Sequence, residues 1–312
     1  KTWVGGVDAS WHTPGNWSPS GVPVFTDAVT IAANVSVTAI TPAISFSSLT
    51  LGNGAGTAVA NLHLATTVAS GGSVRVNPGA GLTQATTRQL VFDGDFVMLS
   101  GSSLTHAAAS AVSVASVNVR VTGTFDLQAG ATINVVGRGF LGGAVDTNGS
   151  GPGGGVADTA NNEGGGGGGY GGVGGGGVGA PGGSGGATYP SLTAPILMGS
   201  GGSGAGNTGT GGAGGGIVIL DVGTLNLDGV IFSSGGAGRS VPTGTTAAGG
   251  GGGSGGGVFL TATALTGAGT IDARGGPGTS GTGAARVPGA AGRLSQHGHP
   301  PTRPTTVESQ PP

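Results

Sequence analysis

The sequence predicts an all-β fold, namely a parallel β-solenoid (β-helix) with glycine-rich, polyglycine-II-like excursions. One pattern occurs three times, over residues 117–139, 214–238 and 255–278. Each copy has an alternating strand rich in β-branched residues, a short glycine turn, a second alternating strand and then glycine. Such units cannot bury an apolar face alone and must stack. No segment shows helical periodicity with capping residues, which excludes a helical repeat.

Composition separates this chain from ordinary disordered glycine-rich sequences. Of its 312 residues 76 are glycine and only 7% are charged. Glycine at this level favours disorder, but charge-driven disorder needs low hydrophobicity together with high net charge. Here the net charge is −2 and 36% of the residues are hydrophobic. We therefore expect close backbone packing of small residues.

Several functional classes are excluded by residue types. There is no cysteine, so disulfide and thiol chemistry are absent. Lys1 is the single lysine, and the ten basic residues are scattered, which argues against a nucleic-acid surface and against a phosphate loop. No apolar run reaches the roughly 20 residues of a membrane span. A first residue other than Met fits a processed, secreted protein, so an extracellular location is expected.

Residues 1–31 hold all three tryptophans, Trp3, Trp11 and Trp17. Large aromatic side chains gathered in a chain of small residues predict a cap over the open end of the stack. The alternative is a carbohydrate-binding platform, because tryptophan faces can stack on sugars. The same three residues, together with Pro300, Pro301 and Pro304 of the tail, are candidates for self-association.

This opening segment resembles the start of bacterial secreted β-helical surface and adhesin repeat proteins of the autotransporter-passenger type. The matching residues are Thr2-Trp3, Gly5-Gly6, Trp11, Asn16-Trp17, Val22-Pro23, Asp27, Val29 and Ile31. The resemblance implies that the segment leads into β-helix rungs and carries no catalytic role.

The rest of the chain divides by composition into four further regions. Residues 32–141 and 217–292 are expected to form solenoid rungs, the second with a glycine insert near 242–257. Residues 142–216 are a glycine-rich excursion with glycine at 35 of 75 positions, either an ordered layer or a flexible loop. Residues 293–312 are a proline-rich tail expected to be extended and disordered in isolation.

Residues capable of catalysis or metal binding are few, and the sequence predicts no enzyme, no cofactor and no metal site. Asp93 and Asp95 surround Gly94 and are interpreted as a turn, with paired catalytic carboxylates as the alternative. His297 and His299 are too few ligands for a metal, and His63 is interpreted as a strand side chain.

The expected function is that of a secreted structural protein that associates head to tail with copies of itself into a fibre or surface matrix. A surface adhesin or carbohydrate-binding module that contacts glycans or a cell surface is the alternative. A polysaccharide-degrading β-helix enzyme and an ice-binding protein are ranked below both.

Overall fold

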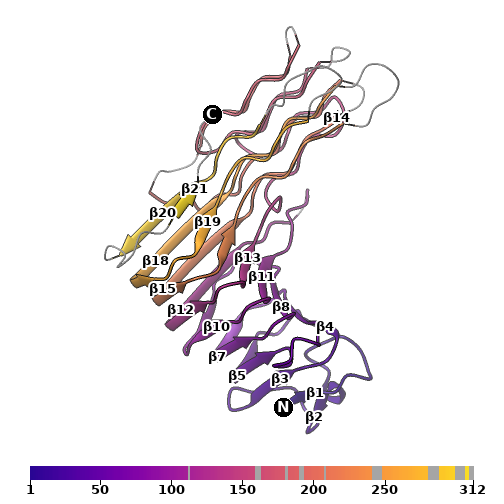
Figure 1. Cartoon of the computed structure of the whole chain (residues 1–312). Coiled ribbons are helices and arrows are strands. Elements are labelled where there is room, and N and C mark those ends of the chain that lie inside the picture. The colour runs from indigo at the N-terminus through magenta and orange to yellow at the C-terminus, as the bar shows by residue number, and fades with distance from the viewer. Residues whose placement is uncertain are drawn as a thin grey trace.

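The computed structural model describes residues 1–111, 113–158, 163–179, 182–189, 193–206, 209–240, 248–279, 288–298 and 306–308. These residues form a nearly all-β protein whose single helix in the described ranges is the 3-10 turn Pro14–Asn16. Two large sheets of 11 and 8 strands lie along the molecule, and a third sheet has two strands. Figure 1 shows the strands succeeding one another from the N-terminus at the bottom to the C-terminal strands at the upper left.

The first large sheet contains the longer strands. Its order is β2 (Trp17–Ser18), β1 (Thr2–Trp3), β3 (Ala28–Ile31), β5 (Ile44–Leu51), β7 (Val68–Val76), β10 (Phe96–Met98), β12 (Val117–Leu127), β15 (Ile217–Leu227), β18 (Gly257–Thr266) and β20 (Arg293–Gly298), with β9 (Leu90–Phe92) beside β12. All its pairs are parallel except β1 with β2.

The second large sheet is parallel throughout. Its order is β4 (Val35–Ala39), β6 (Ala60–Leu64), β8 (Gly81–Gln84), β11 (Ser103–His106), β13 (Thr132–Asn134), β16 (Val230–Phe232), β19 (Thr270–Asp272) and β21 (Thr306–Glu308). From β3 onward the chain passes from one large sheet to the other and back, so that each strand pairs with a later strand of its own sheet. The small antiparallel sheet joins β14 (Gly209–Thr210) and β17 (Arg239–Ser240).

The three similar sequence segments lie next to one another in register. In the first sheet Val119 of β12 is opposite Leu220 of β15, which is opposite Leu260 of β18. In the second sheet Ile133 is opposite Ile231, which is opposite Ile271. The prediction that the copies stack in parallel is therefore confirmed, although residues 140–213 intervene between the first copy and the second.

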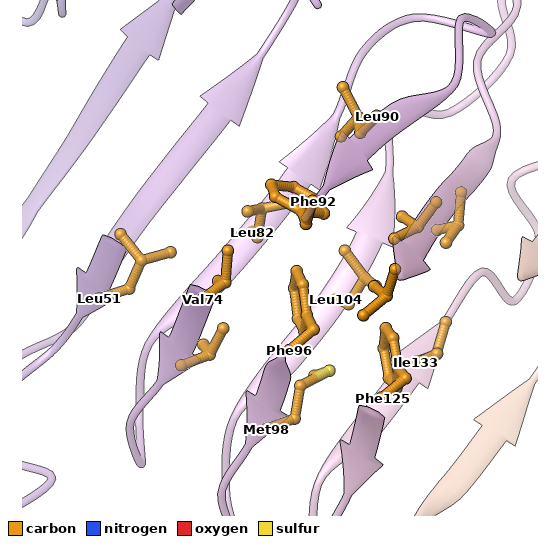
Figure 2. Close-up of a cluster of buried hydrophobic side chains, with 14 of the residues drawn as sticks. Leu51, Val74, Leu82, Leu90, Phe92, Phe96, Met98, Leu104, Phe125 and Ile133 are labelled. Carbon is orange, nitrogen blue, oxygen red and sulfur yellow. The ribbon is translucent and has the colours of Figure 1, made fainter. Parts of the chain in front are cut away.

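Inward-facing apolar side chains of the two sheets form one continuous core, which Figure 2 shows around Phe96. A row of aromatic rings runs through it. The ring centroids of Phe46 and Phe92 are 6.3 Å apart, and those of Phe92 and Phe96 are 5.3 Å apart. Phe96 stacks on Phe125 with a centroid distance of 4.9 Å and an interplanar angle of 2°. The alternating apolar and polar residues of each strand place these rings inward and the polar residues outward.

The C-terminal region differs from the expected extended tail. Residues 293–298 form β20, with Leu294 opposite Val258, and residues 306–308 form β21, with Val307 opposite Ile271. The parallel stack thus continues past residue 292 into the segment predicted to be a tail. Leu294 packs on the core. Pro300, Pro301 and Pro304 lie outside the described residues.

Removing one ring of the aromatic row should destabilise the whole stack. Phe96→Ala is expected to lower the free energy of unfolding by about 3–5 kcal/mol, because it removes a fully buried side chain that contacts two neighbouring rings. Denaturant unfolding followed by circular dichroism measures the change. The control Thr83→Ala, on the outward face of β8, should change it by less than about 0.5 kcal/mol. Equal effects of the two substitutions would contradict a continuous core.

Candidate functional site

The N-terminal segment covers the first strands of both large sheets. β1 pairs with β3 through Thr2 and Thr30. On the second sheet the Trp11 N–H donates to the Thr38 carbonyl at 2.9 Å, and the Thr38 N–H donates to the Ala9 carbonyl at 2.8 Å. These bonds saturate strand backbone that would otherwise be open to pairing, as expected for a cap.

The three tryptophans lie inside this cap. The exposed fractions of Trp3, Trp11 and Trp17 are 5%, 0% and 2%, and the rings pack edge to face at centroid distances of 5.1 and 4.9 Å. The Trp17 indole N–H donates to the Trp11 carbonyl at 2.8 Å. In this arrangement the ring faces are occupied by one another, which argues against sugar binding or contact with another copy through them; both stay predictions.

Asn16 has a role that sequence reasoning missed. It is fully buried, its Nδ2 donates to Asp8 Oδ1 at 2.7 Å and to the Ser10 carbonyl at 3.0 Å, and its Oδ1 accepts the Val7 N–H. Hydrogen bonds from the Ser10 N–H, Thr13 and Asn16 hold the pKa of Asp8 below its usual value. The pair closes the loop that carries Trp11. Its sequence signal is the Asn16-Trp17 dipeptide.

Extended glycine-rich stretches project from one end of the second-sheet strands (Figure 1). The chain leaves after β13, β16 and β19 and returns into β15, β18 and β20. We call the described stretches 139–156, 163–179, 182–189, 193–206, 209–216, 233–238, 248–256, 273–279 and 288–292 the glycine segments. Their backbones bond to one another, so the described part of the 142–216 excursion forms an ordered layer.

Hydrogen bonds between the glycine segments follow a spacing of three residues. Gly199 and Gly202 donate to the antiparallel segment 209–216, at Gly215 and Gly212. Gly201 and Gly204 donate to a second stretch, at Ser150 and Thr147, and Ser203 donates to a third, at Gly166. The N···O distances are 2.8 to 2.9 Å. Donors three apart point in one direction, so each segment has three bonding faces.

This arrangement requires glycine wherever a segment is surrounded. A Cβ on Gly253 would overlap the carbonyl of Ala213, and one on Gly166 would overlap the carbonyl of Ser184. Larger residues occupy outward positions, such as Leu141 with 40% exposure and Val173 with 62%. Large side chains therefore lie at exposed positions, and the enclosed positions hold glycine or a small residue such as Ser203.

Buried polar side chains cross-link the glycine segments. Ser203 Oγ donates to the Val156 carbonyl at 3.0 Å, and Ser254 Oγ accepts the Ser200 N–H at 2.8 Å. Ser200 Oγ donates to the Tyr189 hydroxyl at 2.6 Å, and that hydroxyl donates to the Met198 carbonyl at 2.6 Å. Burial raises the pKa of Tyr189 despite the bond from Ser200. These hydroxyl groups thus make hydrogen bonds that hold the segments together, and burial keeps the Tyr189 hydroxyl protonated.

His106 links β11 of the second sheet to the start of β15, where segment 209–216 enters the first sheet. It is fully buried at the end of β11, its Nδ1 lies 2.8 Å from the Ala107 carbonyl, and its Nε2 accepts the Ile217 N–H at 3.2 Å. These bonds assign a neutral ring protonated at Nδ1. Burial lowers the pKa of His106 to about 4, and the charge of Arg138 acts in the same direction.

The remaining candidate residues are separate from one another. Asp93 and Asp95 lie in a bend between β9 and β10, where Asp95 Oδ1 accepts the Thr124 N–H at 2.8 Å. This supports a turn. His63 lies in β6 as predicted, His297 lies in β20, and His299 is outside the described residues.

The described ranges hold neither a candidate metal site nor a candidate membrane-spanning helix. They contain no group of three His, Asp or Glu residues placed to hold a metal ion. They also contain no helix long and apolar enough to cross a membrane. An open groove of about 600 Å³ lies between residues 109–114 and the first glycine segment, and Val114, Phe140 and Leu141 form its apolar wall. It carries serine hydroxyls and no charged side chain.

Comparisons with known proteins give no relative. No family model matches the chain, no curated protein is similar to it, and no solved structure resembles its fold. Interpretation therefore depends on the chain's own geometry.

A methyl group inside the glycine segments should separate them. Gly253→Ala is expected to cost about 1–3 kcal/mol, because the new Cβ overlaps the Ala213 carbonyl and both segments must move. Hydrogen exchange should show faster amide exchange in 209–216 and 248–256, with little change in β5 and β7. The control Gly54→Ala adds the same methyl where no atom lies within 4 Å. Unchanged exchange in the Gly253→Ala variant would contradict the packing described.

Acid should destabilise the fold through His106. In the unfolded chain its pKa is near 6.5, and in the folded protein it is about 4. Between these values the unfolded state binds a proton that the folded state excludes, so stability is complete above pH 6.5 and falls by about 3 kcal/mol as the pH decreases through 4.

His106→Gln retains a hydrogen-bond acceptor but does not titrate in this range. Denaturant unfolding at pH 7 and pH 4 is the measurement. The wild type should lose about 3 kcal/mol more than the variant, and equal losses would remove His106 from the explanation.

Proposed function

We propose that this chain is an extracellular structural β-solenoid that self-associates into a fibre or surface matrix. The observation that carries the proposal is the continuous set of backbone hydrogen bonds running from two parallel sheets into the glycine segments. Chain passage between the sheets, with parallel pairing at each return, is the pattern of a solenoid. The three-residue hydrogen-bond spacing matches a polyglycine-II-like helix, which has three residues per turn.

Charge and site chemistry favour a structural role. The chain has few ionisable groups. Besides Tyr189, which bonds within the glycine segments, and His12, whose pKa is lowered by burial, three groups with shifted pKa values serve the fold: Asp8 closes the N-terminal loop, His106 bonds to the start of β15, and Asp272 binds Arg274. Burial opposes ionisation of Asp272, but hydrogen bonds from Arg274 and Ser234 keep its pKa below the usual value. Perturbed groups gathered in a cleft would favour an enzyme, and these three are spread along the molecule.

The ends of the stack differ in a way that bears on assembly. The tryptophan cap covers β3 and β4, whereas β20 and β21 are the last strands of their sheets in the described ranges. An outermost strand offers unpaired backbone to another chain. We therefore place the end-to-end contact at β20 and β21, against the outer surface of the cap. The resemblance of residues 1–31 to secreted bacterial surface proteins favours the extracellular location.

The adhesin alternative has lost its candidate residues, because the tryptophan faces are buried. It would now need a binding site on an outer sheet face or in the groove beside Phe140. A glycan array tests it directly, since selective binding to one glycan would favour an adhesin over a purely structural protein.

Self-association should depend on concentration and on the last strands. Mass photometry and electron microscopy of the wild type should show oligomers or fibres that dissociate on dilution. Lysines at two positions of β20, Ser295→Lys with His297→Lys, should reduce end-to-end assembly at least tenfold, because charged edge strands resist pairing. The control Thr83→Lys adds charge to a strand inside the sheet and should have little effect. A monomer at every concentration would overturn the proposal.

A further inference from the structure

One glycine segment has a bonding face with no partner. In segment 163–179, residues 172–179 run antiparallel to segment 182–189. Gly174 donates to the Gly186 carbonyl at 2.9 Å, and Gly177 donates to the Gly183 carbonyl at 2.5 Å. On a second face Gly175 donates to the Pro288 carbonyl at 3.3 Å.

The third face contains Val173 and Gly176, again three residues apart. Both residues are exposed, Val173 at 62%, and neither N–H has an acceptor among the residues that the structure describes. Segments that are enclosed use all three faces. This face is therefore an open edge of the hydrogen-bonded array, comparable with the outermost strand of a sheet.

Gly176 is a second, independent observation. A Cβ on Gly174 would overlap the Gly167 carbonyl, and one on Gly177 would overlap the Gly164 carbonyl, so packing within the chain explains both glycines. A Cβ on Gly176 would have only the Gly183 carbonyl near it, at 3.7 Å, and its φ is not in the left-handed region. Nothing among the described residues requires glycine at 176, but close approach of another backbone would.

We infer that the Val173–Gly176 face is a lateral contact that binds the same face of a second copy of this chain. The partner must offer an extended glycine backbone with unpaired N–H and carbonyl groups every three residues, and residues 172–179 supply one. No residue from 164 to 179 is charged, so two such faces meet without repulsion. Antiparallel neighbours already occur between this segment and 182–189.

A two-fold axis relates antiparallel, identical segments, which makes the contact self-complementary. The inference rests on the proposed self-association and names a lateral surface for it, distinct from the end-to-end contact at β20 and β21. Continuing the array by one layer would satisfy the free Val173 and Gly176 amides and cover the exposed valine. The contact is a backbone addition of the kind that sheet edges make with a further strand.

A side chain at Gly176 tests the contact without disturbing the monomer. Gly176→Glu should weaken lateral association at least tenfold by sedimentation equilibrium, because the side chain holds the two backbones apart. The matched control Gly54→Glu places the same side chain at another exposed glycine with free space around it and should associate like the wild type. Should Gly176→Glu disturb the fold, Val173→Glu replaces an already exposed side chain and carries the same expectation.

Because the chain contains no cysteine, disulfide cross-linking provides a positional readout. Under mild oxidation Gly176→Cys should form a covalent dimer, whereas Gly54→Cys should form none. If Gly176→Glu and Val173→Glu both associate as well as the wild type, the lateral contact is overturned and the end-to-end proposal stays intact. A wild type that is monomeric at all concentrations would overturn both. Protection of the Gly176 amide only on adding an oligoglycine peptide would assign the face to a different glycine-rich chain and overturn the second copy as occupant.

Discussion

Backbone-to-backbone hydrogen bonding between neighbouring extended segments is the interaction on which the whole structure depends. In the two large sheets each strand bonds to neighbours on two sides, and its side chains occupy the other directions. In the glycine segments the donors point in three directions, as Gly199, Gly201 and Ser203 show. A backbone can approach from all sides only when side chains are removed, so the same interaction gives sheets where residues alternate and a packed layer where glycine dominates.

The two regimes stabilise the molecule by different means. Between the sheets, burial of aliphatic and aromatic side chains supplies the driving force, and the row from Phe46 to Phe125 extends it along the stack. The glycine segments bury little apolar surface, so their order depends on satisfied amides and on the serine and tyrosine hydroxyls between them. His106 lies where the regimes meet, and its neutral form suits a site that needs one buried acceptor.

These features explain why the backbone arrangement is a better guide to the role of this protein than its ionisable side chains. The ionisable side chains in the described ranges are dispersed, and Asp8, His106 and Asp272 bond to structural partners, whereas unpaired backbone is found at defined places. Unpaired backbone recognises another extended chain and not a small molecule. A role built on repeated backbone contact follows more directly from this geometry than a role built on a binding pocket.

The sequence by itself determined that residues 117–139, 214–238 and 255–278 stack in parallel, because alternating apolar residues must share an interior with an identical pattern. It also predicted that the tryptophans form a cap, with a sugar-binding platform as the alternative, but only the tertiary structure placed their ring faces against one another. Whether the glycine block is ordered could not be read from sequence, since glycine has no side-chain period and Ser200 finds its partner at Ser254, 54 positions away. Likewise β20 has one apolar anchor, Leu294, and its register is set by β18. Local patterns specify which face of a strand is buried, whereas bonds between distant backbones exist only once the chain is folded.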